Sequence, residues 1–385
     1  MEDKIYEIAV VGAGPAGSFL SYLLAKAKIK VVFIDKDIFP REKVCAGGLT
    51  PRALEILPFS LNPVLEKEIS SFRLIYKNSH DLIKKYPKPL VYTVNRARFD
   101  YFLVKKAQKA GAIFSPGHEV KKISEKASFF QIQAGQKTLK AKIIVGADGA
   151  NSFVAKMFNL KSEMIDIGLQ YEIPYQHKKD IQVITLGWGL IPHSYSWVFP
   201  NNQFLAVGVG GPKKLGKKLK TYLDDWLKLL NLKKNHSPLK GHPMKHRLKK
   251  TPLVKENIVL IGDAAGLNDP LTGEGIFYAF KSAQMVAFHL QDYLTGNEKA
   301  LKNYEQEINN KILPELKAAW FFNQISPIFF PIVFKLIRRN DDYWQLFCRL
   351  TRGEKTFLEM KKLLRPDRLI KKIYERKKAT SKSSR

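Results

Sequence analysis

The chain has 385 residues, 45% hydrophobic and 11% aromatic, so it can bury a large core and is not disordered as a whole. Its two cysteines, Cys45 and Cys348, exclude a disulfide framework and favour a reducing compartment. The formal net charge of +30 suits a lysine-rich solvated surface, an anionic membrane or a phosphorylated substrate. Nucleic acid is the least favoured partner, because no nucleic-acid motif accompanies the lysines.

Residues 5–35 predict a strand, a glycine-rich turn, a helix and a second strand, which together form the βαβ unit of a dinucleotide site. In the turn, Gly12 permits a tight bend, Gly14 lets backbone N–H groups approach a pyrophosphate, and Gly17 lets the helix pack closely. Asp35 follows the second strand, where a carboxylate can bind a ribose hydroxyl. This unit alone does not distinguish FAD from NAD. Because the first strand starts at once, we expect no signal peptide and a cytoplasmic location.

The segment 39–51 contains Cys45 and the pair Gly47-Gly48, whose backbone we expect to lie close to something flat or bulky. Taken alone, Cys45 is better explained as a small buried residue. Short strands are predicted in 70–94, followed by a helix that runs to Ala110. At the entrance of that helix, Arg96 can bind a phosphate through two hydrogen bonds or form a surface ion pair.

Residues 114–144 alternate like β structure and lead into Asp148-Gly149. This dipeptide marks either the carboxyl end of a parallel strand, where ligands of α/β proteins bind, or an ordinary capped turn. Residues 165–210 predict successive strands, and hence an antiparallel sheet inserted into the α/β domain. Residues 212–250 predict one amphipathic helix within a basic surface.

A third glycine-rich segment begins where a buried strand runs into Gly262-Asp263. The following loop contains Pro270, Gly273 and Gly275 and leads into a helix near Ile276. The amino end of such a helix can stabilise negative charge on a flavin ring, and Asp263 can accept a hydrogen bond from a sugar hydroxyl.

The C-terminal part, 300–373, predicts helices with aromatic clusters, which suit a cap over a pocket, a membrane-facing module or a packed core. Its apolar stretch at 318–337 is interrupted by Pro327, Pro331 and polar residues such as Asn323, so we expect no membrane-spanning helix. The basic tail at 368–385 suits peripheral contact with the inner face of an anionic membrane.

The segments Gly12–Gly17, Asp148-Gly149 and Gly262-Asp263 together resemble the FAD-binding arrangement of the p-hydroxybenzoate hydroxylase-like flavoproteins. The resemblance implies an α/β two-domain flavoprotein: a Rossmann-like FAD-binding domain, an inserted antiparallel-sheet substrate domain and a C-terminal helical region. It also implies FAD as the cofactor. The cofactor-binding residues expected on this basis are Gly12, Gly14, Pro15, Ala16, Gly17, Asp35, Lys36, Cys45, Ala46, Gly47, Gly48, Arg96, Asp148, Gly149, Gly262, Asp263, Pro270, Gly273, Gly275 and Ile276.

Within that superfamily the chain resembles the geranylgeranyl reductases, through FPREKVCAGGLTP at 39–51, PHSYSWVFP at 192–200 and GDAAGLNDPLTGEGI at 262–276. The second segment matches the family signature PxxYxWxFP and is the most specific of the three. Alternation along a strand places Tyr195, Trp197 and Phe199 on one face, as a substrate-binding wall or as an aromatic core. Ala46 stands where many members have a glycine, and the halogenase motif WxWxIP is absent.

The resemblance implies an FAD-dependent oxidoreductase that reduces C=C bonds of a geranylgeranyl or other polyprenyl group. NAD(P)H is the expected electron donor, and a ferredoxin-like protein carrier is the alternative. Cys45 would lie near the flavin and is the candidate catalytic residue, as proton donor. Two alternatives stay open: an FAD-dependent monooxygenase acting on an aromatic or quinone, and a non-catalytic flavoprotein docked on membrane or RNA. We expect no metal site, and the sequence does not indicate the oligomeric state.

Three domains are expected from the order of these segments. The FAD-binding domain combines 1–72 with 94–158 and 252–298. The substrate domain combines 73–93 with 159–251, and the helical cap with its basic tail covers 299–385.

Overall fold

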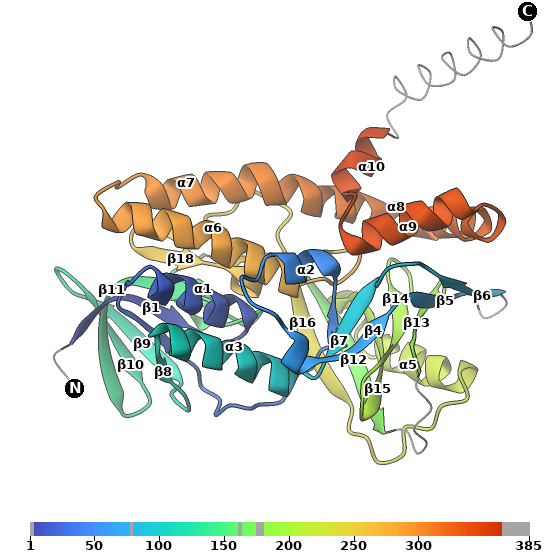
Figure 1. The fold of residues 1–385 in the computed structure, drawn as a ribbon, viewed down its shortest axis with the longest axis horizontal. Helices are drawn as coiled ribbons and strands as arrows, with labels where there is room; N and C mark the ends of the chain where they lie inside the picture. Colours follow the sequence, from blue (N-terminus) through green and yellow to red (C-terminus); the bar gives the residue numbers. More distant parts are fainter. Residues whose placement is uncertain (1–3, 78–79, 161–163, 175–180, 364–385) are drawn as a thin grey trace, which may run out of the picture.

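A computed structural model of the protein describes residues 4–77, 80–160, 164–174 and 181–363. The basic tail at 368–385 lies outside these described residues. Two large sheets stand next to each other beneath a layer of helices (Figure 1). The predicted fold class is confirmed: an α/β domain with parallel central strands, a largely antiparallel second sheet and a helical C-terminal region.

The first sheet is built around the predicted βαβ unit, in the order β17-β18-β11-β1-β2-β8, with β10 and β9 continuing from β11. Its strands are β1 (Ile5–Val11), β2 (Val31–Ile34), β8 (Ile113–Ser115), β9 (Val120–Glu125), β10 (Phe130–Ala134), β11 (Lys137–Gly146), β17 (Val254–Lys255) and β18 (Ile258–Leu260). The pairs β1–β2, β1–β11 and β11–β18 are parallel, so these strands end at one edge of the sheet. The three cofactor segments of the sequence follow that edge, where ligands of α/β folds bind.

Helices α1 (Pro15–Lys26), α3 (Arg96–Ala110) and α6 (Ile276–Leu294) pack together on this sheet. The predicted bounds of α3 are confirmed. Asn95 caps its first turn by accepting the N–H groups of Ala97 and Arg98, and Gly111 ends it with a φ of +108°. Two short helices, α2 (Pro51–Glu55) and α4 (Phe153–Met157), flank the same domain.

The second sheet runs in the order β16-β12-β15-β14-β13-β5-β6. Its strands are β5 (Ser71–Tyr76), β6 (His80–Lys85), β12 (Met164–Pro174), β13 (Val183–Trp188), β14 (Tyr195–Pro200), β15 (Phe204–Pro212) and β16 (Lys240–His246). All neighbours are antiparallel except β13 and β5, which come from distant parts of the chain. Helix α5 (Lys218–Leu229) covers one face with Leu223 and Trp226, which leaves the other face for a pocket.

A small sheet, β3-β7-β4, lies between the two large ones in the chain path. It consists of β3 (Gly48–Leu49), β4 (Leu65–Ile69) and β7 (Val91–Val94), and the 3₁₀ turns are η1 (Asn62–Val64), η2 (Lys213–Leu215) and η3 (Gly262–Ala265). The division of the chain into three domains at the expected boundaries stays a prediction.

The predicted amphipathic helix within 212–250 is α5, but strand β16 in the same segment was not predicted. This strand contains Pro243 and several lysines and histidines, and it lacks the apolar alternation typical of strands. Its position at the edge of the sheet explains both features, since an edge strand tolerates proline and polar residues.

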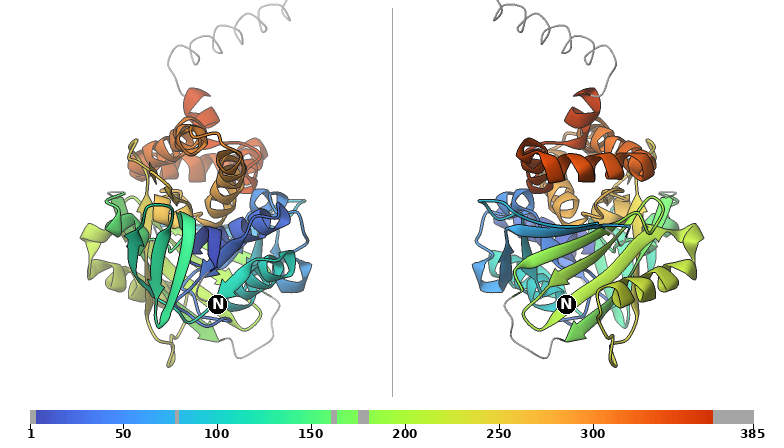
Figure 2. Two further views of the ribbon diagram at one scale, coloured as in Figure 1. Left: turned by 90° about the vertical axis from the view of Figure 1, so that its left-hand side faces the viewer. Right: turned by 90° about the vertical axis from the view of Figure 1, so that its right-hand side faces the viewer.

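The helical layer consists of α7 (Ala300–Glu307), a π-helical turn η4 (Ile308–Ile312), α8 (Leu313–Arg339), α9 (Asp341–Arg352) and α10 (Phe357–Leu363). It lies across the top of both sheets in the two side views (Figure 2). Helix α8 continues through Pro327 and Pro331. The expectation that this stretch does not span a membrane stays a prediction. Each proline removes one backbone hydrogen bond, while buried neighbours such as Phe322 and Phe334 keep the helix packed on the protein.

The continuous helical run 300–339 is long and apolar enough to cross a membrane by length and composition alone. Only 28% of its most apolar window is buried in the protein, and Ile328 and Ile332 are exposed. The polar Asn323 within it is nevertheless buried and donates hydrogen bonds to the carbonyl oxygens of His193 and Pro270. These two bonds dock α8 on the rest of the protein.

Candidate functional site

One large cavity, with a volume of about 1040 Å³, begins at the glycine turn of β1 and α1 and reaches the helices α8 and α9. It is lined by every residue that the sequence assigned to the cofactor or the substrate except Gly17, Gly47 and Gly262. Gly17 and Gly47 instead allow close backbone packing, and a Cβ atom on Gly262 would lie 3.0 Å from that of Ala16. A Cβ atom on Gly17 would lie 1.9 Å from the carbonyl oxygen of Gly12, and one on Gly47 would lie 2.3 Å from that of Val94.

The glycine turn fits a pyrophosphate. Gly12 has a φ of +103°, and a Cβ atom there would lie 2.3 Å from the carbonyl oxygen of Ala147 at the end of β11. The turn opens directly into α1, whose first backbone N–H groups are available to an anion. Asp35 accepts the N–H of Ala13 at 2.7 Å and that of Asp37 at 3.0 Å, so it fixes the turn from β2. Its contact with a ribose stays a prediction.

Two arginines meet at one buried carboxylate beside this turn. Arg96 donates two bonds to Asp100, at 2.8 and 2.7 Å, and Arg41 lies 3.2 Å from the same carboxylate. Arg96 therefore forms an ion pair, but this pair is buried and not on the surface as one of the two expectations had it. Arg96 also lines the cavity, and its contact with a phosphate stays a prediction. Arg41 was missed in the sequence. Its Nη1 is buried and has no hydrogen-bond partner among the described residues, which suits an anion bound in the cavity.

Asp148 follows β11 and caps α4, since its Oδ2 accepts the N–H groups of Phe153 at 2.7 Å and Val154 at 3.1 Å. Asp148 therefore caps a turn and also lines the cavity, although the sequence indicated these two roles as alternatives. Its other oxygen, Oδ1, is buried without a partner in the described part of the chain. Burial raises the pKa of this carboxyl group.

The loop that contains Cys45 is fixed against the second sheet. Gln170 on β12 donates to the carbonyl oxygen of Cys45 at 3.2 Å, and the N–H of Gly47 points to the Cys45 sulfur at 3.4 Å. Gly48 lies against Phe199, because a Cβ atom there would come within 2.6 Å of the ring. The two segments most typical of the family in the sequence are therefore in contact at the cavity wall.

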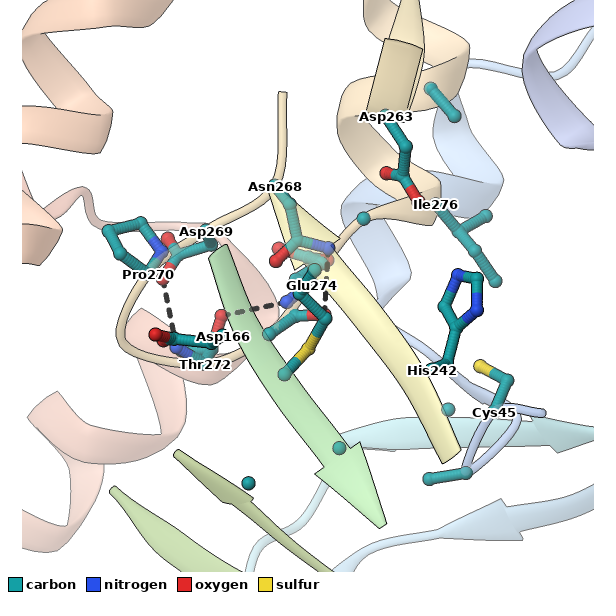
Figure 3. Close-up of a pocket in the computed structure, with 18 of the residues that line it drawn as sticks. Cys45, Asp166, His242, Asp263, Asn268, Asp269, Pro270, Thr272, Glu274 and Ile276 are labelled. Atoms are coloured by element: carbon teal, nitrogen blue, oxygen red, sulfur yellow. Dashed lines mark hydrogen bonds between the residues drawn. The ribbon is translucent and has the colours of Figure 1, made fainter. Parts of the chain in front are cut away.

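Lys43 and His242 form a pair near Cys45, with Lys43 Nζ 2.9 Å from His242 Nε2. Figure 3 shows His242 and Cys45 on one side of the cavity and the loop with Asp269 and Thr272 on the other. Burial, with the positive charge of Arg96, lowers the pKa of Lys43 to about 8. Burial and the Lys43 charge lower the pKa of His242 to about 3, so His242 is a neutral acceptor. Neither residue was singled out in the sequence.

The loop between η3 and α6 is held from three directions. Asp269 is fully buried and accepts the N–H groups of Leu271 and Thr272 at 2.8 and 2.9 Å. Tyr195 on β14 donates to the carbonyl oxygen of Thr272 at 2.5 Å. Glu274 binds Arg52 from α2, and Asn323 of α8 binds the carbonyl oxygen of Pro270. The loop is thus fixed before any ligand binds.

Tyr195, Trp197 and Phe199 all face the cavity from β14, while Ser196 and Val198 are buried on the opposite face. The predicted alternation is therefore present. The Trp197 ring extends across β15, because a Cβ atom on Gly208 would lie 2.3 Å from it. Glycines thus provide room for a flat aromatic floor.

Beyond this floor the cavity becomes apolar. Phe72, Ile184, Leu186 and Trp188 line it from β5 and β13, and α8 and α9 contribute aromatic residues opposite them. Trp188 lies 5.1 Å from Phe330 and 6.1 Å from Phe347 between ring centroids. The site therefore consists of a polar arm beside the glycine turn and an apolar arm beneath the helical layer, joined at the aromatic floor.

Comparison with known proteins agrees with this geometry. The FAD binding domain family matches residues 5–173. An uncharacterized protein of Methanosarcina barkeri is 32% identical over 87% of each chain. Digeranylgeranylglycerophospholipid reductase of Methanococcus vannielii is 33% identical over 79% of this chain and 80% of its own.

Among solved structures, a geranylgeranyl bacteriochlorophyll reductase-like protein of Thermoplasma acidophilum shares the fold. Its TM-score is 0.76 at 23% identity, over 97% of this chain and 99% of its own. The sequence matches carry the family assignment, and the solved structure shows that the fold is shared. The chain belongs to the geranylgeranyl reductase family of FAD-binding oxidoreductases.

Proposed function

We propose that the protein saturates C=C bonds of a geranylgeranyl or related polyprenyl group. The observation that supports this most directly is the junction of the two arms. A long apolar arm, lined from β5, β13, α8 and α9, meets a polar arm suited to FAD at the aromatic floor of β14. A polyprenyl chain needs such an apolar wall, and an alkene at the junction would lie beside the cofactor.

The protein's own part is to bind, orient and exclude water. FAD, once bound and reduced, supplies the hydride. The glycine turn and Arg41 would hold the pyrophosphate, and Asp263 would hold the ribityl chain. Trp197 and Phe199 would orient the alkene on a water-poor face. Positive charge that develops on carbon during reduction would be attracted to these aromatic faces.

Cys45 is the proposed proton donor, because it lines the cavity on the loop that contacts Phe199. The nearby Lys43 ammonium offers a second source of a proton. Alkene reduction that survives in a folded, FAD-loaded Cys45→Ala variant would remove the thiol from this role. Loss of reduction in Cys45→Ala, with reduction preserved in Lys43→Gln, would support it.

The electron donor is proposed to be NAD(P)H. Peripheral contact with a membrane is proposed for the substrate's delivery, because Ile328 and Ile332 are exposed on α8 and Ile332 also lines the cavity. Lys335 and Arg339 are exposed on the same helix and suit an anionic surface.

The test is mass spectrometry after anaerobic incubation of the dithionite-reduced holoprotein with geranylgeranyl diphosphate and with archaeal-type prenyl lipids. We expect products heavier by two hydrogens per reduced bond. Gain of one oxygen under air would indicate the monooxygenase alternative. No change in any prenyl species, with FAD bound and reducible, would refute the proposal.

A further inference from the structure

A second histidine on β16 is placed quite differently from His242. His246 is 2% exposed, and both of its ring nitrogens have partners. Nε2 lies 3.1 Å from Oδ2 of Asp166 on β12, and Nδ1 lies 3.0 Å from the carbonyl oxygen of Asn268. The His246 ring therefore connects the second sheet to the first residue of the loop 268–275, which lines the cavity.

The chemistry of these partners determines the protons on the ring. A backbone carbonyl and a carboxylate only accept hydrogen bonds, so both bonds form only if both nitrogens carry hydrogen. Burial alone would lower the pKa of His246, but the hydrogen bond to Asp166 raises it overall. The other charged groups that act on the ring are Asp269 from the loop and Asp263 from η3, and both are acidic.

Asn268 contacts both His246 and the far end of the loop 268–275. Its carbonyl oxygen binds His246, and its side-chain Nδ2 lies 3.5 Å from the carbonyl oxygen of Gly273. A Cβ atom on Gly275 would lie 2.7 Å from the same Nδ2, so the loop folds tightly around this side chain. Whatever fixes Asn268 therefore also helps to fix Gly273 and Gly275, the two glycines of this loop that are expected to bind FAD.

We propose that His246 is a positioning residue, held doubly protonated by Asp166, which fixes the loop 268–275 in the conformation that binds FAD. This inference rests on the proposed FAD site, and it does not depend on the substrate. Deprotonation leaves one N–H for two acceptors, so either Asp166 or the Asn268 carbonyl then faces a lone pair. FAD affinity therefore falls as the pH rises through the pKa of His246.

Asp166→Asn separates this role from simple packing. The Asn side chain can present its amide N–H to a neutral Nε2, while Nδ1 still donates to Asn268. Both bonds thus survive at every pH, and the alkaline loss of affinity should disappear. His289→Gln is the matched control, because His289 pairs with Glu307 at 2.9 Å on the far part of α6, outside the cavity.

The experiment measures FAD affinity of the apoprotein by flavin fluorescence from about pH 6 to about pH 9. We expect affinity to fall about tenfold or more across this range in the wild type and in His289→Gln. The FAD affinity of Asp166→Asn should stay within about threefold of its value at neutral pH. His246→Gln should bind FAD weakly at every pH in this range.

Nitrogen NMR of the eight histidines, with His246 identified by its loss in His246→Gln, supplies a reading independent of binding. Two protonated ring nitrogens at neutral pH support the proposal. A single protonated ring nitrogen on His246 at neutral pH overturns the proposal. An unchanged loss of FAD affinity at alkaline pH in Asp166→Asn overturns it as well. Because no prenyl substrate is present, a failure to reduce alkenes would count against the proposed function alone.

Discussion

The flat position of the Trp197 ring depends on Gly208, and replacing that glycine with alanine should show it. The new methyl group would lie 2.3 Å from the ring and 2.7 Å from the carbonyl oxygen of Leu169. Both distances are far below normal contact, so the ring has to leave the floor of the cavity. Forced repacking of this kind costs about 1–3 kcal/mol of unfolding free energy.

Gly210→Ala provides the matched control on the same strand and the same face. Its methyl group would lie 3.4 Å from Ser194 Oγ and from the Trp197 ring, which is ordinary contact. Since glycine weakens a strand, this variant should be unchanged or more stable by about 0.5–1 kcal/mol. The two substitutions are chemically identical, so a difference between them reports crowding at Gly208 by the Trp197 ring and the Leu169 carbonyl oxygen. A Trp197→Leu variant separates the contribution of the ring.

Urea unfolding of both variants measures these free energies. Prenyl reduction should fall by up to about 100-fold in Gly208→Ala, because a displaced ring no longer orients the alkene. FAD binding should persist, since the glycine turn is untouched. Adding Trp197→Leu to Gly208→Ala should recover part of the lost stability. Equal unfolding free energies for Gly208→Ala and Gly210→Ala would refute the position of the Trp197 ring across β15.

Three further predictions concern the polar arm. Gly12→Ala should abolish FAD binding, measured by flavin retention on purification, because its methyl group would lie 2.3 Å from a backbone oxygen. Tyr195→Phe should cost about 0.5–1.5 kcal/mol in urea unfolding, since it removes the bond to Thr272. Lys43 has its pKa lowered to about 8, so its charge destabilises the apoprotein below that pH. Stability relative to Lys43→Met should therefore rise as the pH increases from 8 towards the ordinary lysine value.

The cofactor edge of the first sheet was predictable because local signals determine it. A glycine turn such as Gly12–Gly17 requires special backbone geometry, and the acid Asp35 follows a buried strand of recognisable pattern. The face of β14 was predictable for a similar reason, since alternation in a strand fixes which side chains share a side.

The site residues that the sequence did not indicate reach the cavity through contacts between distant segments. Arg41 and Lys43 lie in a loop without periodicity, and only the fold brings them to Asp100 and His242. The strand β16 has no apolar pattern because it lies at a sheet edge and faces a polar arm. The continuity of helix α8 also depends on the fold. Its prolines are tolerated because tertiary packing, with Asn323 bound to Pro270, supports the helix.

The second sheet explains how one cavity can hold both a charged cofactor and an apolar chain. Its cavity-facing side chains change in character from one edge strand towards the other. On β16 and β12 they are mostly polar or ionisable, such as His242 and Gln170, with Met244 as an apolar exception. On β13 and β5 they are apolar, such as Ile184 and Phe72.

Between these two zones, β15 contributes glycines and β14 contributes the aromatic ring that lies across them. Because a strand is only about 4.8 Å from its neighbour, this change occurs within a few side chains. An alkene on the apolar side would therefore lie within reach of a flavin on the polar side. In the proposed function, the strand order of this sheet, as much as any single residue, would bring the two reactants together.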